Sequence, residues 1–152
     1  MGIAVYNEVP MIFNDGRDEH RFTVKLSPAT ESFRLESGMI KRSIFIGKRM
    51  FNKLFQFVRN EYGHNLGQIK YDDEQMINGS ATTEQHDQFR FHIEEGDGIE
   101  VVLENEAVPD RKLRASIKPV YSTETERKAH LQAMMPSVLA AVILVREASP
   151  VL

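Results

Sequence analysis

The stretch Arg21-Phe-Thr-Val-Lys-Leu26 alternates strictly between polar and apolar side chains. This period of two predicts a β-strand with Phe22, Val24 and Leu26 on the inner side and the basic residues on the other. Two further alternating stretches follow at residues 32–36 and 39–46, after turns marked by Pro28 and Gly38. The chain therefore begins as an antiparallel meander, preceded by an edge-like strand at residues 3–13.

A helical spacing of apolar residues follows the meander. Met50, Phe51, Leu54, Phe55, Val58 and Tyr62 recur on one stripe, and Gly63 is placed to end the helix. We expect a helix over residues 47–62, with Phe51, Phe55 and Tyr62 in the core.

The second half repeats this order. Strands are expected at residues 66–71, 88–93, 99–104 and 113–118, with a polar loop at 72–85 and a hairpin turn at Gly96-Asp97-Gly98. Thr123-Glu124-Thr125-Glu126 fits a capping box that opens a last helix. Its apolar residues Leu131, Met134, Met135, Val138 and Leu139 are expected in the core or in a subunit contact.

The expected fold is α+β. One domain, residues 1–152, would contain two antiparallel four-stranded sheet-plus-helix units (ββββα repeated), with pseudo-repeat halves 1–64 and 65–152. Each helix would cover one face of its sheet and leave the other face open.

Charge is arranged in blocks along the chain. Residues 21–70 hold ten bases and three acids, a balance of +7, whereas residues 71–110 hold twelve acids and one base, a balance of −11. Seven of the thirteen aromatic residues lie in the basic block. Cations bind phosphates and exposed rings stack on unpaired bases, so the basic block favours a single-stranded nucleic acid as ligand.

Strand alternation places most of the strand bases on the open sheet face. The candidate nucleic-acid-binding residues are Arg21, Lys25, Arg34, Lys41, Phe45, Arg90, Arg114 and Lys118. Phe45 could stack on a base, or it could be covered by a partner subunit.

The order of elements resembles the Whirly proteins and the C-terminal domain of the transcriptional positive cofactor four. The closest stretch contains Phe22-Thr-Val-Lys-Leu26, Gly38-Met-Ile-Lys-Arg42, Ser43-Ile-Phe-Ile46 and the expected helix from Gly47. This resemblance implies repeated ββββα units and sheet faces that bind single-stranded DNA without strong sequence preference. It implies that role for Lys25, Arg34, Lys41 and Phe45.

The sequence offers little support for catalysis. Five scattered histidines form no metal-ligand pair, and no dinucleotide-binding, phosphate-loop or nucleophile-elbow motif occurs. His92 and Glu94 share one strand side, which suits either an acid–base pair or a solvated strand face. With no cysteine, thiolate metal sites and disulfides are excluded. We expect no enzyme activity, no cofactor and no metal.

The location and partners are also expectations. No signal peptide is visible, and the longest apolar run, residues 138–145, is too short to cross a bilayer about 30 Å thick. We expect a cytoplasmic homo-oligomer, without membrane contact, that binds single-stranded DNA or RNA in replication, transcription or genome processing. The alternative is a protein-interaction or regulatory module that uses the acidic 71–110 surface to dock a partner or mimic DNA.

Overall fold

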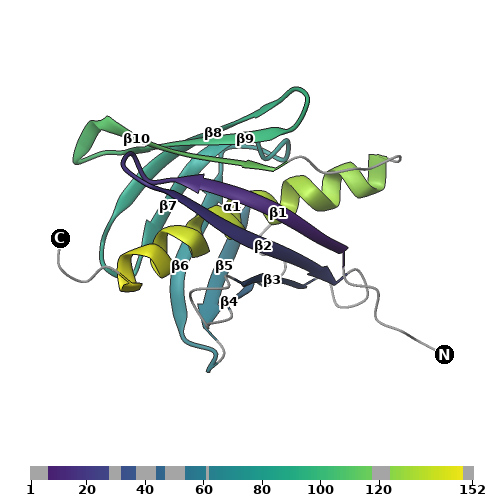
Figure 1. Cartoon of the computed structure of the whole chain (residues 1–152), viewed down its shortest axis with the longest axis horizontal. Coiled ribbons are helices and arrows are strands. Elements are labelled where there is room, and N and C mark those ends of the chain that lie inside the picture. Colours follow the sequence, from purple (N-terminus) through teal and green to yellow (C-terminus); the bar gives the residue numbers. More distant parts are fainter. Residues whose placement is uncertain are drawn as a thin grey trace.

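The computed structural model describes residues 7–27, 32–36, 44–46, 54–60, 62–117 and 124–148. They form a closed antiparallel β-barrel around one long helix (Figure 1). The strands are β1 (Asn7–Asn14), β2 (Glu19–Ser27), β3 (Ser32–Glu36), β4 (Ile44–Ile46), β5 (Phe55–Asn60), β6 (Asn65–Tyr71), β7 (Asn78–Thr83), β8 (Gln88–Glu95), β9 (Ile99–Asn105) and β10 (Val108–Ile117). The helix is α1 (Glu124–Ala148).

Each strand pairs with its neighbours in the chain, and β1 pairs with both β2 and β10. This last pairing closes the ring in the order β1-β10-β9-β8-β7-β6-β5-β4-β3-β2. Closure satisfies the backbone groups that an open sheet would leave at its edges.

Alternation along the strands decides which side chains face inwards. In β8, Phe89, Phe91 and Ile93 are buried, while Gln88, Arg90 and His92 between them are exposed. The same pattern puts Phe22 and Val24 of β2 inside the barrel. The expected Gly96-Asp97-Gly98 hairpin joins β8 to β9 as predicted.

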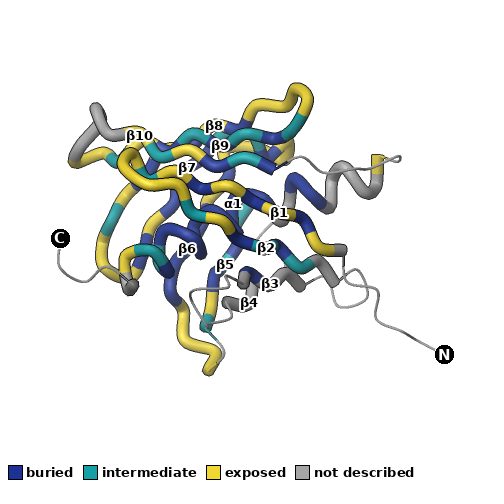
Figure 2. Tube along the Cα trace, viewed as in Figure 1, coloured by how far each residue is buried: buried dark blue, intermediate teal, exposed yellow. Residues whose placement is uncertain are grey.

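Helix α1 runs through the barrel and supplies its core (Figure 2). It contacts strands on several sides of the ring, from β2 through β7 and also β9. The consecutive residues 138–142 are all buried, so every side of the helix is covered there. A helix that is apolar all round is stable in water only when it is enclosed in this way. The predicted core residues Leu131, Met134, Met135, Val138 and Leu139 are confirmed as buried.

Two glycines let neighbouring parts of the molecule approach closely. A Cβ at Gly67 of β6 would lie 2.9 Å from Leu139 Cδ2 on the helix and 3.0 Å from the Thr82 carbonyl oxygen. A Cβ at Gly79 of β7 would overlap the Lys70 carbonyl oxygen and the Phe91 ring. These contacts show that strand β6 packs directly on the helix, and that strand β7 packs closely on β6 and on the Phe91 side chain inside the barrel.

The predicted fold class is wrong. The described strands form one closed sheet around a single helix, where two ββββα units were expected. The first expected helix, over residues 47–62, is also wrong, because residues 55–60 form strand β5 between β4 and β6. The expected loop at 72–85 likewise contains strand β7. Pairing on both sides within the ring overrides the local spacing in both places.

Candidate functional site

Strand β5 presents two aromatic rings and a cation to the outside of the barrel. Gln56 and Val58 are buried, whereas Phe55 and Phe57 are half-buried on the other face and Arg59 is exposed. Their outward position corrects the expectation that Phe55 belongs to a helical core. Tyr62, in the β5–β6 turn, is 77% exposed, and it too lies outside the core. Phe51 lies outside the described residues.

Each of the two rings is paired with a cation. The Arg59 guanidinium carbon lies 5.8 Å from the centre of the Phe57 ring, and Lys70 Nζ lies 5.9 Å from that of Phe55. Both distances are within the range of cation–π attraction. Within the described part of the chain neither cation has a carboxylate partner. Their charges are therefore available to an external anion.

Strand register extends this surface across β3 and β2. Arg59 pairs with Phe45, Phe45 with Arg34, and Arg34 with Lys25, which gives one row across four strands. With strands about 4.8 Å apart, the row is about 14 Å long. Lys25, at one end, is half-buried and its Nζ lies 3.5 Å from Glu8 Oε1.

We call this surface the basic wall; its strand positions are Lys25, Arg34, Phe45, Phe55, Phe57, Arg59 and Lys70. Strands β2 to β6 contain five Lys and Arg and only two Glu, a balance of +3. Strands β4, β5 and β6 contain no acid at all. The local field therefore favours anions.

The fold does not bring the other predicted site residues together on the basic wall. Arg21 is exposed on β2, beside the basic wall, 3.6 Å from Glu19. Arg90 donates to Asp72 at 2.9 Å and Arg114 donates to Glu100 at 2.8 Å, both away from the basic wall. Lys41 and Lys118 lie outside the described residues.

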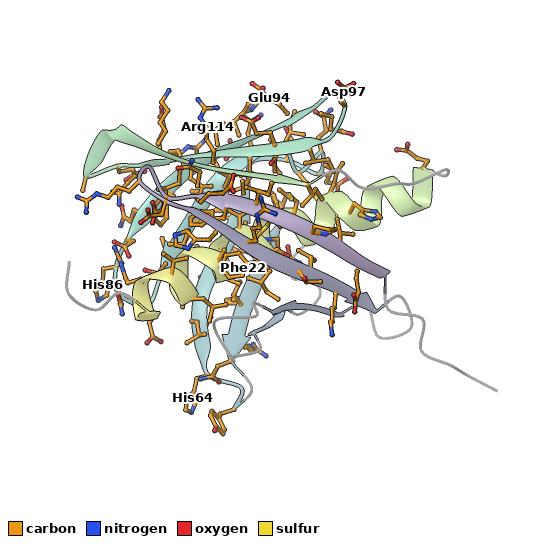
Figure 3. The ribbon with its side chains drawn as sticks, in the orientation of Figure 1. Phe22, His64, His86, Glu94, Asp97 and Arg114 are labelled. Atoms are coloured by element: carbon orange, nitrogen blue, oxygen red, sulfur yellow. The ribbon has the colours of Figure 1, made fainter. Side chains whose placement is uncertain are left out.

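The opposite side of the barrel carries the acidic residues. We call this surface the acidic wall; it contains Glu94, Glu95, Asp97, Glu100 and Glu104 of β8, β9 and their turn. In the ring order, β9 and β4 are five strands apart in either direction. Figure 3 shows the same separation: Glu94 and Asp97 lie at the top, and His64 of the β5–β6 turn lies at the bottom. Part of each charge block of the sequence thus lies on one of two opposite faces.

The histidines hold no assembled chemistry in the described residues. His92 Nδ1 lies 2.7 Å from Asn78 Oδ1, and its Nε2 lies 3.7 Å from Glu94 Oε1, all on the solvated outer face. Among these residues, no three His, Cys, Asp or Glu side chains gather as a metal ion requires. The geometry at His92 is that of a surface hydrogen-bond and ion-pair group.

No protein-family model, curated protein or solved structure matches this chain. The two walls are therefore the features of this chain that bear on its function. Within the ranges that the structure describes, no helix combines the length and apolar composition needed to cross a membrane.

Sequence reasoning missed four residues of the basic wall: Phe55, Phe57, Arg59 and Lys70. A signal for the first three was present, because Phe55-Gln-Phe-Val-Arg59 alternates with period two as well as fitting a helical stripe. Lys70 lies in a stretch correctly expected to be a strand, and only its register opposite Phe55 connects it to the site.

Proposed function

We propose that this protein is a non-catalytic binder of single-stranded nucleic acid, with DNA as the expected ligand. The observation that supports this most directly is the two ring–cation pairs on the outer face of β5 and β6, strands that contain no acidic residue. Binding of this kind serves processes that expose unpaired strands, such as replication, transcription and genome processing.

Cations and rings have different parts in the proposed binding. Arg59 and Lys70 attract backbone phosphates, since neither has a carboxylate partner in the described part of the chain. Phe55 and Phe57 offer ring faces on which bases stack, and stacking tolerates any base sequence. A duplex hides its base faces inside the helical stack, so the rings favour an unpaired strand.

The interaction should depend strongly on salt. Arg59 and Lys70, at about 0.7 counterions released per contact on a single strand, predict a contribution of about −1.4 to the slope of log affinity against log salt. Replacing both should remove that contribution by the same relation.

Fluorescence anisotropy with labelled oligo-dT and with a labelled duplex tests this proposal. We expect tighter binding to oligo-dT, and we expect Arg59→Gln with Lys70→Gln to make the salt slope shallower by about 1.4. The matched control is Arg90→Gln with Arg114→Gln, which removes two cations that already have carboxylate partners. The control should retain most of the slope.

The stacking part has its own variant. Phe57→Leu keeps an apolar side chain but removes the ring face, and it should weaken oligo-dT binding about tenfold, since a stacked base contributes about 1–3 kcal/mol. No affinity for oligo-dT at low salt would refute the proposed function. That result would leave partner docking by the acidic 71–110 surface as the function to pursue.

A further inference from the structure

The two walls bear opposite charge and cannot meet within one molecule. Residues 88–105, which form β8, β9 and their turn, contain five acids and one base, a balance of −4. Strands β2 to β6 carry +3. Because β9 and β4 lie on opposite sides of the closed ring, the two walls face in opposite directions. Their attraction is therefore satisfied only by another molecule.

The acidic wall contains a like-charge pair that a cation would relieve. Glu94 and Glu100 are direct partners across β8 and β9, an arrangement that destabilises a strand pair. Arg114 lies 2.8 Å from Glu100 and His92 lies 3.7 Å from Glu94, yet the two glutamates remain 45% and 67% exposed. Both carboxylates can accept further cations from outside.

The basic wall offers matching cations. Arg59 and Lys70 are exposed and are held by ring contacts, so they can engage a carboxylate without first breaking an ion pair of their own. A closed barrel presents no free strand edge, so contact between copies must be made by side chains on the walls.

We propose that the acidic wall of one copy docks on the basic wall of a second copy, in competition with nucleic acid. The competition rests on the proposed function, whereas the docking itself does not. The contact joins two different surfaces, so it is head-to-tail and leaves one wall free at each end. Association is then open-ended, and the mean mass rises with concentration instead of stopping at a dimer.

Sedimentation velocity of the whole chain tests the docking. The wild type should form concentration-dependent oligomers at about 0.1 M salt and separate at about 1 M, where the Debye length falls from about 10 Å to about 3 Å. Two variants change one wall each: Arg59→Glu with Lys70→Glu, and Glu94→Lys with Asp97→Lys. The first brings the basic wall from +3 to −1, so both of its walls are negative, and the second brings residues 88–105 from −4 to 0. Each variant alone should be monomeric, because neither keeps two walls of opposite charge.

Mixing the two variants tests directly whether the acidic wall of one copy binds the basic wall of another. An equimolar mixture pairs the intact acidic wall of one variant with the intact basic wall of the other, so association should return. Far-UV circular dichroism confirms that each variant is folded. The matched control is Asp18→Lys with Glu84→Lys, which changes the charge equally at exposed turn positions away from both walls and should still associate.

Two results would overturn the docking: a wild type that stays monomeric at low salt, or a mixture that stays monomeric when the wild type associates. Adding oligo-dT separates this proposal from the function. Dissociation of the oligomers on addition of oligo-dT supports competition for the basic wall. Oligomers that bind oligo-dT without dissociating overturn the competition. Affinity for oligo-dT without self-association overturns only the docking, whereas self-association without such affinity overturns only the proposed function.

Discussion

The packing of helix α1 against the barrel wall can be tested at Gly67 and Leu139. Leu139 is fully buried, and Leu→Ala at such sites costs about 3–5 kcal/mol. Gly67→Ala introduces a methyl group 2.9 Å from Leu139 Cδ2, and overpacking of this kind costs about 1–3 kcal/mol. An unfolding free energy in the upper part of the ordinary range of about 5–15 kcal/mol leaves both variants folded enough to measure.

The double variant should lose less than the sum of the two. Leu139→Ala removes the atom that the new methyl group meets, and the methyl then fills part of the cavity, which recovers about 0.8 kcal/mol for one carbon. The contact of the new Cβ with the Thr82 carbonyl oxygen, at 3.0 Å, is present both in Gly67→Ala alone and in the double variant. Its cost therefore cancels when the four free energies are compared in a double-mutant cycle. We expect a coupling of about 1–2 kcal/mol between the two positions.

Guanidinium unfolding followed by circular dichroism supplies the four free energies from the midpoints and slopes. Gly96→Ala serves as the matched control, since nothing lies within 4 Å of a Cβ at that turn position. Combined with Leu139→Ala it should be additive. Additivity within about 0.5 kcal/mol for Gly67 as well would show that the helix does not pack on β6, and it would refute the enclosed-helix arrangement.

Two further predictions concern the barrel alone. Gly79→Ala should destabilise the fold by more than about 2 kcal/mol in the same assay, because the new Cβ overlaps the Lys70 carbonyl oxygen, and a loss no larger than that of Gly96→Ala would contradict this. Asp15 should stabilise the fold in a pH-dependent way. Burial raises the pKa of its carboxyl group, but hydrogen bonds from the Asp18 amide, His20 and the Arg17 amide outweigh burial, so the pKa lies below its ordinary value. Its contribution is complete above the ordinary pKa and is lost as the pH falls through the lowered pKa. Asp15→Asn should therefore flatten the fall in urea midpoint as the pH is lowered through this range, and an unchanged slope would contradict the prediction.

Strands with strict alternation could be predicted from the sequence. Phe22 and Val24 of β2, and Phe89, Phe91 and Ile93 of β8, are buried as expected. In each case the inner face is apolar and the outer face polar, so one strand carries its own signal. Helix α1 was also found, because its capping residues and its long apolar segment are local features.

Strands β5 and β7 could not be assigned in this way. The apolar residues of 50–62 fit both a helical stripe and an alternating strand, and pairing of β5 with β6 decides between them. Strand β7, Asn78-Gly-Ser-Ala-Thr-Thr83, is built of small residues with a weak signal, and it is held by β6 and β8 on either side. Ring closure depends on contacts between residues far apart in sequence, such as Met11 with Ile117.

Prediction of the candidate site from the sequence was limited by the same dependence on distant contacts. Alternation within single strands shows which side Arg90 and Arg114 face, and both are exposed. It cannot show that Asp72 and Glu100 lie within ion-pair distance of them, since those acids come from other segments. The division of bases between two walls appears only when the strand order is known.

The enclosed helix follows the ten strands of the described residues, and this order affects how the protein is made. Chains leave the ribosome from the N-terminus, so the inner faces of β1 to β10 emerge before residues 131–144 that cover them. Until those residues emerge, the apolar side chains on the inner faces of the strands can contact one another, as Tyr71 and Phe91 do, but they lack the helix that covers them. Synthesis of the last helical turns is therefore the step after which the apolar inner faces of the strands can be buried and the barrel can fold completely.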